Sequence, residues 1–195
     1  VNNTAKYTTG SVSFMDLYSL VTGLIGQNGR RGALMLSISS EHPDLEEFIS
    51  VKTDLNKVTK ANISVRMSDD FMRAVAKDTE YNLQFIREET KEIIVKTVKA
   101  RDIFMKLAET NWDYAEPGIL YWDSIENRCL LEHDTNFKFA GTNPCAEEPL
   151  PAGGSCLLGS INLAEFVKKD GKFDFVDFRK AVGIAVEALN EVLDE

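Results

Sequence analysis

The residues of this chain that could do chemistry gather in one stretch, GTNPCAEEPLPAGGSC, at residues 141–156. Pro144 excludes a helix interior there and favours an extended backbone at Asn143. In an extended segment the side chains of Asn143, Cys145 and Glu147 project to the same side. The spacing therefore predicts a cluster of an amide, a thiol and a carboxylate. Such a cluster could supply a hydrogen-bond donor, a hydrogen-atom or nucleophilic centre, and a base.

Three alternatives for Cys145 stay open at this point. It could be a small buried hydrophobic residue between two turn residues. A zinc site has little support, because the three cysteines and two histidines, His42 and His133, show no CxxC or HxxxH spacing. We therefore expect no metal ion at the site. A cysteine hydrolase would need a histidine base beside Cys145, and His133 is the candidate near it in the sequence.

Composition and charge narrow the class of protein. The 195 residues are 44% hydrophobic and 27% charged, which is ordinary for a globular domain or part of one. The net charge of −9 argues against a nucleic-acid partner, although a local arginine could still bind a small anion. We expect no membrane segment, because no apolar run is long enough. Three cysteines make no disulfide framework, so we expect a reducing, cytoplasmic location. The start at Val1 and the charged helical end predict a fragment of a larger protein.

Helical and strand patterns alternate along the chain. Apolar residues at helical spacing predict helices, and short apolar or alternating runs between turn residues predict strands. The predicted helices cover residues 14–25, 42–50, 68–78, 100–112 and 175–193. The predicted strands cover residues 33–39, 61–67, 81–86, 92–98 and 119–125, and the pattern at 92–98 would also suit a helix. This alternation is typical of an α/β fold with much parallel sheet, in one domain or part of one.

The stretch NPCAEEPLPAGGSCLLGSINLAEFV resembles the active-site finger loop of ribonucleotide reductase large subunits. The family pattern there is Asn-x-Cys-x-Glu, a short spacer, and a cysteine that leads into a Gly-Ser-Ile-Asn-Leu run. The segments SVSFMDLYSLVTGLIGQNGRRGALMLSISSEHPDLEEFI, VTKANISVRMSDDFM and EPGILYWDSIEN are similar to further parts of that family, in the same order. The resemblance implies that residues 1–195 are part of a ten-stranded α/β barrel, the catalytic domain, with the finger loop at about 141–150. Such a partial barrel would expose sheet edges that favour pairing between copies.

The resemblance also implies a role for each residue of the motif. Cys145 matches the cysteine that becomes a thiyl radical and takes the 3′ hydrogen from the ribose. Glu147 matches the carboxylate that accepts the 3′-hydroxyl proton, and Asn143 matches the amide that hydrogen-bonds the substrate hydroxyls. Cys156 matches one of two cysteines that reduce the 2′ carbon and end as a disulfide, which an external dithiol such as thioredoxin reduces. Cys129 matches no family position, and we expect it to be structural.

A second segment, at about residues 26–33, is similar to the specificity loop of the family. It contains Gln27, Arg30, Arg31 and Gly32. A Gln and an Arg on a Gly-flanked loop suit recognition of a base edge and a phosphate. The resemblance implies allosteric control, in which a bound deoxynucleotide effector acts through this loop to select the ribonucleotide substrate. Without the resemblance, a solvated basic loop would explain the segment equally well.

The branches of the family differ in how they make the thiyl radical, with a partner subunit, adenosylcobalamin or a glycyl radical. GRRGALMLSIS and NPCAEEPLP resemble the adenosylcobalamin-dependent branch most closely, and Glu147 argues against the glycyl-radical branch. We therefore expect an adenosylcobalamin-dependent ribonucleoside-diphosphate reductase, an oxidoreductase that makes deoxyribonucleotides for DNA replication and forms homo-oligomers at full length.

Two parts of the expected pocket have no match in this chain. These are the second redox cysteine, which should lie upstream, and the turn that binds the substrate phosphates, which should lie downstream. We therefore expect the chain to be inactive by itself. The alternative function is a nucleotide-binding or interaction module derived from a reductase, without catalysis.

Overall fold

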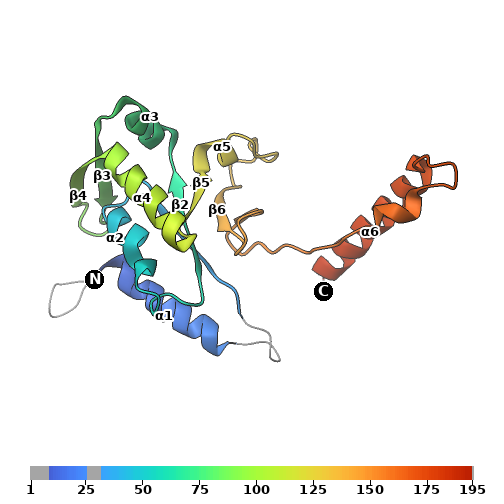
Figure 1. Cartoon of the computed structure of the whole chain (residues 1–195), viewed down its shortest axis with the longest axis horizontal. Coiled ribbons are helices and arrows are strands. Elements are labelled where there is room, and N and C mark those ends of the chain that lie inside the picture. Colours follow the sequence, from blue (N-terminus) through green and yellow to red (C-terminus); the bar gives the residue numbers. More distant parts are fainter. Residues whose placement is uncertain (1–8, 26–31, 195) are drawn as a thin grey trace. The chain divides into compact units, whose positions relative to one another are not determined.

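The computed structural model describes residues 9–25 and 32–194, and the chain divides into two compact units, Val1–Ala152 and Gly153–Glu195 (Figure 1). A three-stranded parallel sheet lies in the first unit, with strand order β1-β2-β5. Its strands are β1 (Met35–Ser39), β2 (Asn62–Met67) and β5 (Gly118–Tyr121). The central strand β2 pairs with both neighbours, Met35 lying opposite Asn62 and Ser64 opposite Gly118.

Helices and two antiparallel hairpins surround this sheet. The helices of the first unit are α1 (Gly10–Leu24), α2 (Leu45–Ser50), the 3-10 helix η1 (Val51–Thr53), α3 (Asp69–Lys77), α4 (Ala100–Tyr114) and α5 (Trp122–Glu126). The hairpins pair β3 (Glu80–Ile86) with β4 (Ile93–Lys99), and β6 (Phe139–Thr142) with β7 (Pro149–Pro151). The hydroxyl of Ser68 caps α3 by accepting the Phe71 N–H at 3.2 Å, as a Ser at this position predicts.

The hydrophobic core lies on one face of β2. Ile63, Val65 and Met67 are almost completely buried, and the alternation of a strand directs them to that same face. They join one cluster with buried residues of α2, α3 and α4, among them Phe71 and Leu107. Full burial of such a side chain stabilises the fold by about 1.5–3 kcal/mol. The core therefore holds β2 in place, and its opposite face carries Asn62, Ser64 and Arg66.

The second unit consists of the 3-10 helix η2 (Leu163–Phe166) and the long helix α6 (Phe175–Asp194). A bridge between Val167 and Phe173 connects the two elements, and the Lys168 ammonium lies 2.9 Å from the Asp174 carboxylate. The rings of Phe166, Phe173 and Phe178 pack together in tilted and edge-to-face arrangements. Helix α6 has no buried residue.

The predicted mixture of helices and strands is confirmed, with two corrections. The strand predicted at residues 119–125 ends at Tyr121, because its pairing with β2 ends there, and α5 follows at once. The Trp122 indole N–H donates to Glu126 at 2.8 Å, which supports this helical turn. Only one of the three sheets is parallel, and no sheet closes into a barrel within residues 9–25 and 32–194.

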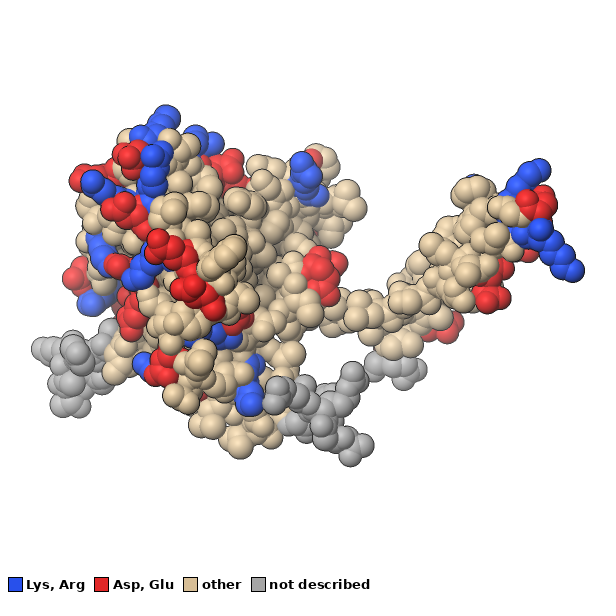
Figure 2. Space-filling view, in the orientation of Figure 1, with Lys and Arg blue, Asp and Glu red and all other residues tan. Residues whose placement is uncertain are grey.

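Two further features are the length of the helices and the distribution of charge on the surface. No helix in the described part of the chain is long and apolar enough to cross a membrane. In the view of Figure 2, Lys and Arg side chains alternate with Asp and Glu over the first unit rather than forming one basic surface.

Candidate active site

Cys145 lies on a tight turn, residues 143–148, between β6 and β7. The Asn143 N–H donates to the Glu148 carbonyl at 3.1 Å, and the Glu148 N–H donates to Asn143 Oδ1 at 3.1 Å. The Ala146 N–H donates to the Asn143 carbonyl at 3.0 Å. The backbone of Ala146 has a positive φ of 67°. The predicted extended conformation is therefore wrong here. The Pro144 ring restricts φ to a value that suits a turn, and the Asn143 side chain bonds its own loop, which also favours a turn.

The turn presents the thiol to solvent. Cys145 and Glu147 are exposed, and Asn143 is partly buried. The alternative of Cys145 as a buried hydrophobic residue is therefore wrong. An exposed thiol and an exposed carboxylate on one short turn are both free to meet a substrate. The Asn143 amide nitrogen has no acceptor among the described residues, since only its oxygen is used to close the turn.

A residue that the sequence analysis missed also contacts this turn. Asn62, the first residue of β2, donates from Nδ2 to the Pro144 carbonyl at 2.7 Å. The two residues are 82 positions apart, and Asn62 belongs to no chemical motif. The only signal in the sequence was a polar residue opening an otherwise buried strand.

Of the other predicted site residues, the structure describes Cys156 and Gly32. Cys156 is exposed and lies in the second unit, ahead of η2, in a stretch without helix or strand. Gln27, Arg30 and Arg31 lie outside the described residues. Gly32 lies against the end of α1, and a Cβ built on it would stand 2.7 Å from the Thr22 carbonyl oxygen.

The remaining cysteine and the loop histidine take no part in the turn. Cys129 is partly buried and lines a mostly apolar groove of about 840 Å³ with Phe137 and Leu150. His133 is 92% exposed and lies 3.6 Å from Glu132. No hydrogen bond joins His133 to Cys145 in the described part of the chain, so the cysteine hydrolase has no support from the structure.

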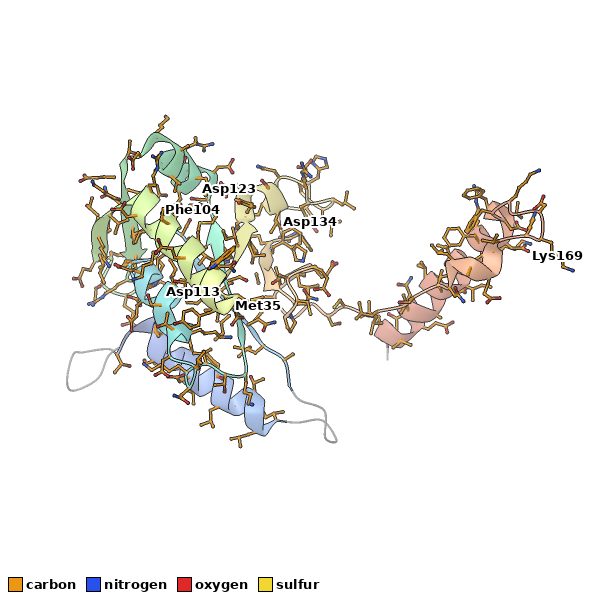
Figure 3. The ribbon with its side chains drawn as sticks, in the orientation of Figure 1. Met35, Phe104, Asp113, Asp123, Asp134 and Lys169 are labelled. Atoms are coloured by element: carbon orange, nitrogen blue, oxygen red, sulfur yellow. The ribbon has the colours of Figure 1, made fainter. Side chains whose placement is uncertain are left out.

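A partly buried cation, Arg66, lies on the polar face of β2. The Arg66 guanidinium stacks over the Trp122 ring at 4.9 Å, and its Nε finds no hydrogen-bond partner among the described residues. Burial lowers the pKa of Arg66, and the nearby Glu126 carboxylate acts in the opposite direction. Asp123, labelled in Figure 3, accepts the Asp69 N–H at 2.8 Å and so joins α5 to the start of α3.

Residues 9–25 and 32–194 contain no group of three or more His, Cys, Asp or Glu that could hold a metal ion. We assign no residue of this chain to cobalamin.

The comparison with protein families identifies the class of protein. Residues 1–195 match the family described as ribonucleotide reductase, barrel domain, and the chain belongs to that family. It is 38% identical to a vitamin B12-dependent ribonucleoside-diphosphate reductase of Thermoplasma acidophilum. This similarity covers the whole chain and 25% of that protein. It is 33% identical to the protein of the same name from Mycobacterium tuberculosis, covering the whole chain and 28% of that protein.

A relative with a different name is less similar. The ribonucleoside-diphosphate reductase large subunit of Ostreid herpesvirus 1 is 27% identical over 87% of the chain and 24% of that protein. The chain thus spans about a quarter of the length of the curated relatives it matches.

Proposed function

We propose that the protein containing this chain reduces ribonucleoside diphosphates to deoxyribonucleotides, with Cys145 as the radical-bearing residue. The observation that carries the proposal is the exposed Cys145 thiol, two positions from the exposed Glu147 carboxylate, on a turn closed by Asn143. Family membership over the whole chain supports it. The names of the relatives favour the vitamin B12-dependent branch.

The first step is a hydrogen-atom transfer at Cys145. As a thiyl radical, its sulfur takes the hydrogen from the 3′ carbon of the ribose, so that an S–H bond forms and the unpaired electron passes to carbon. Breaking one bond while making another of similar strength keeps this exchange nearly balanced. The same S–H group can therefore return its hydrogen to the 3′ carbon at the end of the reaction.

Glu147 and Asn143 assist the loss of the 2′ oxygen. The Glu147 carboxylate accepts the 3′-hydroxyl proton, which makes departure of the 2′ hydroxyl as water easier. The Asn143 Nδ2 group, which the turn leaves without an acceptor, donates to a substrate hydroxyl and orients the ribose. These two residues flank the thiol on the same turn, so substrate binding and proton transfer occur beside it.

Cys156 supplies one of two thiols that reduce the 2′ carbon. Its partner is a cysteine outside this chain. The pair gives up two hydrogens and becomes a disulfide, while the ribose loses its 2′ oxygen as water. A thioredoxin-like dithiol then reduces the disulfide by exchange.

The remaining parts of the proposal concern the full-length protein. It contains the complete ten-stranded barrel. Bound adenosylcobalamin would supply the radical chemistry that removes one hydrogen atom from the Cys145 thiol. A deoxynucleotide effector acts through the loop at about residues 26–33. The enzyme is a cytoplasmic homo-oligomer, and its substrate, effector and reductant are its partners.

The test uses the full-length protein with ribonucleoside diphosphate, dithiol and adenosylcobalamin. We expect deoxyribonucleotide from the wild type, none from Cys145→Ser, and the wild-type rate from Cys129→Ser. Activity that requires a second, radical-bearing subunit would replace the cobalamin branch by the partner-dependent one. Nucleotide binding without any product under either condition would overturn the proposal in favour of a binding module.

A further inference from the structure

One hydrogen bond joins the Cys145 hairpin to the parallel sheet. The hairpin of β6 and β7 shares no strand pairing with β1, β2 or β5. Among the hydrogen bonds between described residues, the one from Asn62 Nδ2 to the Pro144 carbonyl, at 2.7 Å, is the one that links residues 139–152 to the rest of the first unit. An isolated two-stranded hairpin is marginally stable in water, so its position depends on such a link.

Asn62 is itself held firmly. Its backbone N–H donates to the Leu34 carbonyl at 2.8 Å, and it pairs in register with Met35, which is labelled in Figure 3. The next residue, Ile63, is 1% exposed, and its N–H donates to Glu116 Oε1 at 3.1 Å. The side chain that donates to the Pro144 carbonyl therefore belongs to β2, the central strand of the sheet, whose apolar residues are buried.

The acceptor is the group that most directly determines where Cys145 lies. The Pro144 carbonyl and the Cys145 nitrogen belong to one peptide unit, which is planar. Holding that carbonyl oxygen holds the plane, and with it the Cα of Cys145. The closure by Asn143 and Glu148 shapes the turn, whereas the bond from Asn62 places the turn against the sheet.

We propose that Asn62 is a positioning residue for the thiol of Cys145. This inference rests on the proposed function. A hydrogen-atom transfer needs the sulfur close to the 3′ carbon of the ribose, and a misplacement of about 1 Å can cost about 100-fold in rate. Asn62 acts on the reaction through the Pro144–Cys145 peptide unit and does not itself touch the substrate.

The test compares three substitutions at Asn62 in the full-length protein. Asn62→Asp has the same shape but presents an acceptor to the Pro144 carbonyl, and Asn62→Ala removes the donor without adding charge. Asn62→Gln retains the donor on a longer side chain. Asn111 provides a matched control, because its Nδ2 donates to the Pro117 carbonyl at 3.0 Å, away from the turn.

We expect kcat per folded molecule to fall about 10- to 100-fold in Asn62→Asp and Asn62→Ala, with KM little changed. The kinetic isotope effect of a 3′-deuterated substrate should rise in both, because hydrogen transfer becomes rate-limiting. Asn62→Gln should recover part of kcat, and Asn111→Asp should keep the wild-type kcat and isotope effect. A kcat and isotope effect in both Asn62 variants equal to those of Asn111→Asp would overturn the inference.

Hydrogen exchange separates this inference from the proposed function. The amides of Ala146 and Glu148 are hydrogen-bonded within the turn, so we expect their exchange to become faster in Asn62→Ala and not in Asn111→Asp. If the wild type makes no deoxyribonucleotide, the proposed function fails, and the exchange rates still test the placement of the turn. Unchanged exchange in both Asn62→Ala and Asn62→Asp would overturn that placement by itself.

Discussion

The side-chain oxygen of Asn143 accepts the backbone N–H of Glu148 at 3.1 Å, so the residue expected to orient the substrate also closes the turn that presents the thiol. The two polar atoms of its amide thus have separate roles. The oxygen closes the turn, and the nitrogen is the proposed donor to a substrate hydroxyl. Substitutions can separate the two roles, because aspartate retains the acceptor and loses the donor.

The Asn143 pair gives the first prediction. Asn143→Asp should retain the turn and lose most of kcat, because only the donor to the substrate is missing. Asn143→Ala should lose both the donor to the substrate and the hydrogen bond that closes the turn. Loss of that hydrogen bond should destabilise the turn by about 0.5–1.5 kcal/mol. Exchange of the Glu148 amide and steady-state kinetics on the full-length protein measure the two effects. Equal exchange in both variants would show that the side-chain oxygen does not stabilise the turn.

Glu147 and Glu148 allow a second, matched comparison. Glu147→Gln retains size and polarity but removes the base, and a positioned base contributes about 10²–10⁴-fold. We therefore expect kcat to fall within that range. Glu148→Gln is the control, since its backbone closes the turn and its side chain has no assigned role. Equal rates for the two variants would remove Glu147 from the mechanism.

Gly32 gives a third prediction, on stability. A Cβ at this position would lie 2.7 Å from the Thr22 carbonyl oxygen and 3.2 Å from that of Ile25, both of them backbone atoms. Gly32→Ala should therefore destabilise the protein by about 1–3 kcal/mol, as overpacking does. In the control Gly183→Ala, which has open space around it in α6, a gain of about 0.5–1 kcal/mol is expected. Thermal unfolding of the full-length variants measures both.

Because Gly32 belongs to the expected specificity loop, Gly32→Ala should also alter effector control. We expect the preference among ribonucleotide substrates to respond less to an added deoxynucleotide than in the wild type. Substrate competition assays with and without effector measure this response. An unchanged response in a variant with the expected loss of stability would separate Gly32 from regulation.

Glu46 gives a fourth prediction, on pH dependence. Hydrogen bonds from Lys96 and then Lys106, each at 3.1 Å, lower the pKa of the Glu46 carboxyl. Since the folded pKa lies below the unfolded one, this contribution is present above the usual glutamate value of about 4.3 and is lost as pH falls through the folded pKa. The pairs are partly exposed, so solvent limits their contribution to about 1 kcal/mol or less.

Glu46→Gln should therefore lower the free energy of unfolding at pH 7 and have a smaller effect as pH falls below about 4. Urea unfolding at several pH values measures this difference. Glu47→Gln is the control, because the neighbouring carboxylate is exposed and forms no ion pair with the described residues. A Glu46→Gln effect that stays constant with pH would show that lost packing, rather than lost charge, is responsible.

The sequence by itself was enough for the class of fold and for the identity of the chemical motif. Helix α1 and strand β2 follow from apolar spacing and alternation, which are local properties of the chain. The Asn-x-Cys-x-Glu motif could likewise be identified from the sequence, because an amide, a thiol and a carboxylate rarely occur together at that spacing. Ser68 as a helix cap is a further local signal that the structure confirms.

Only the tertiary structure decided how the motif is presented and what holds it. The turn at residues 143–148 depends on closure by Glu148, and Pro144 alone could not distinguish a turn from an extended segment. The end of β5 at Tyr121 depends on where the pairing with β2 stops. The contact of Asn62 with Pro144 joins residues 82 positions apart, and no local pattern encodes a contact between distant segments. Such contacts arise only when the core has placed β2 beside the hairpin.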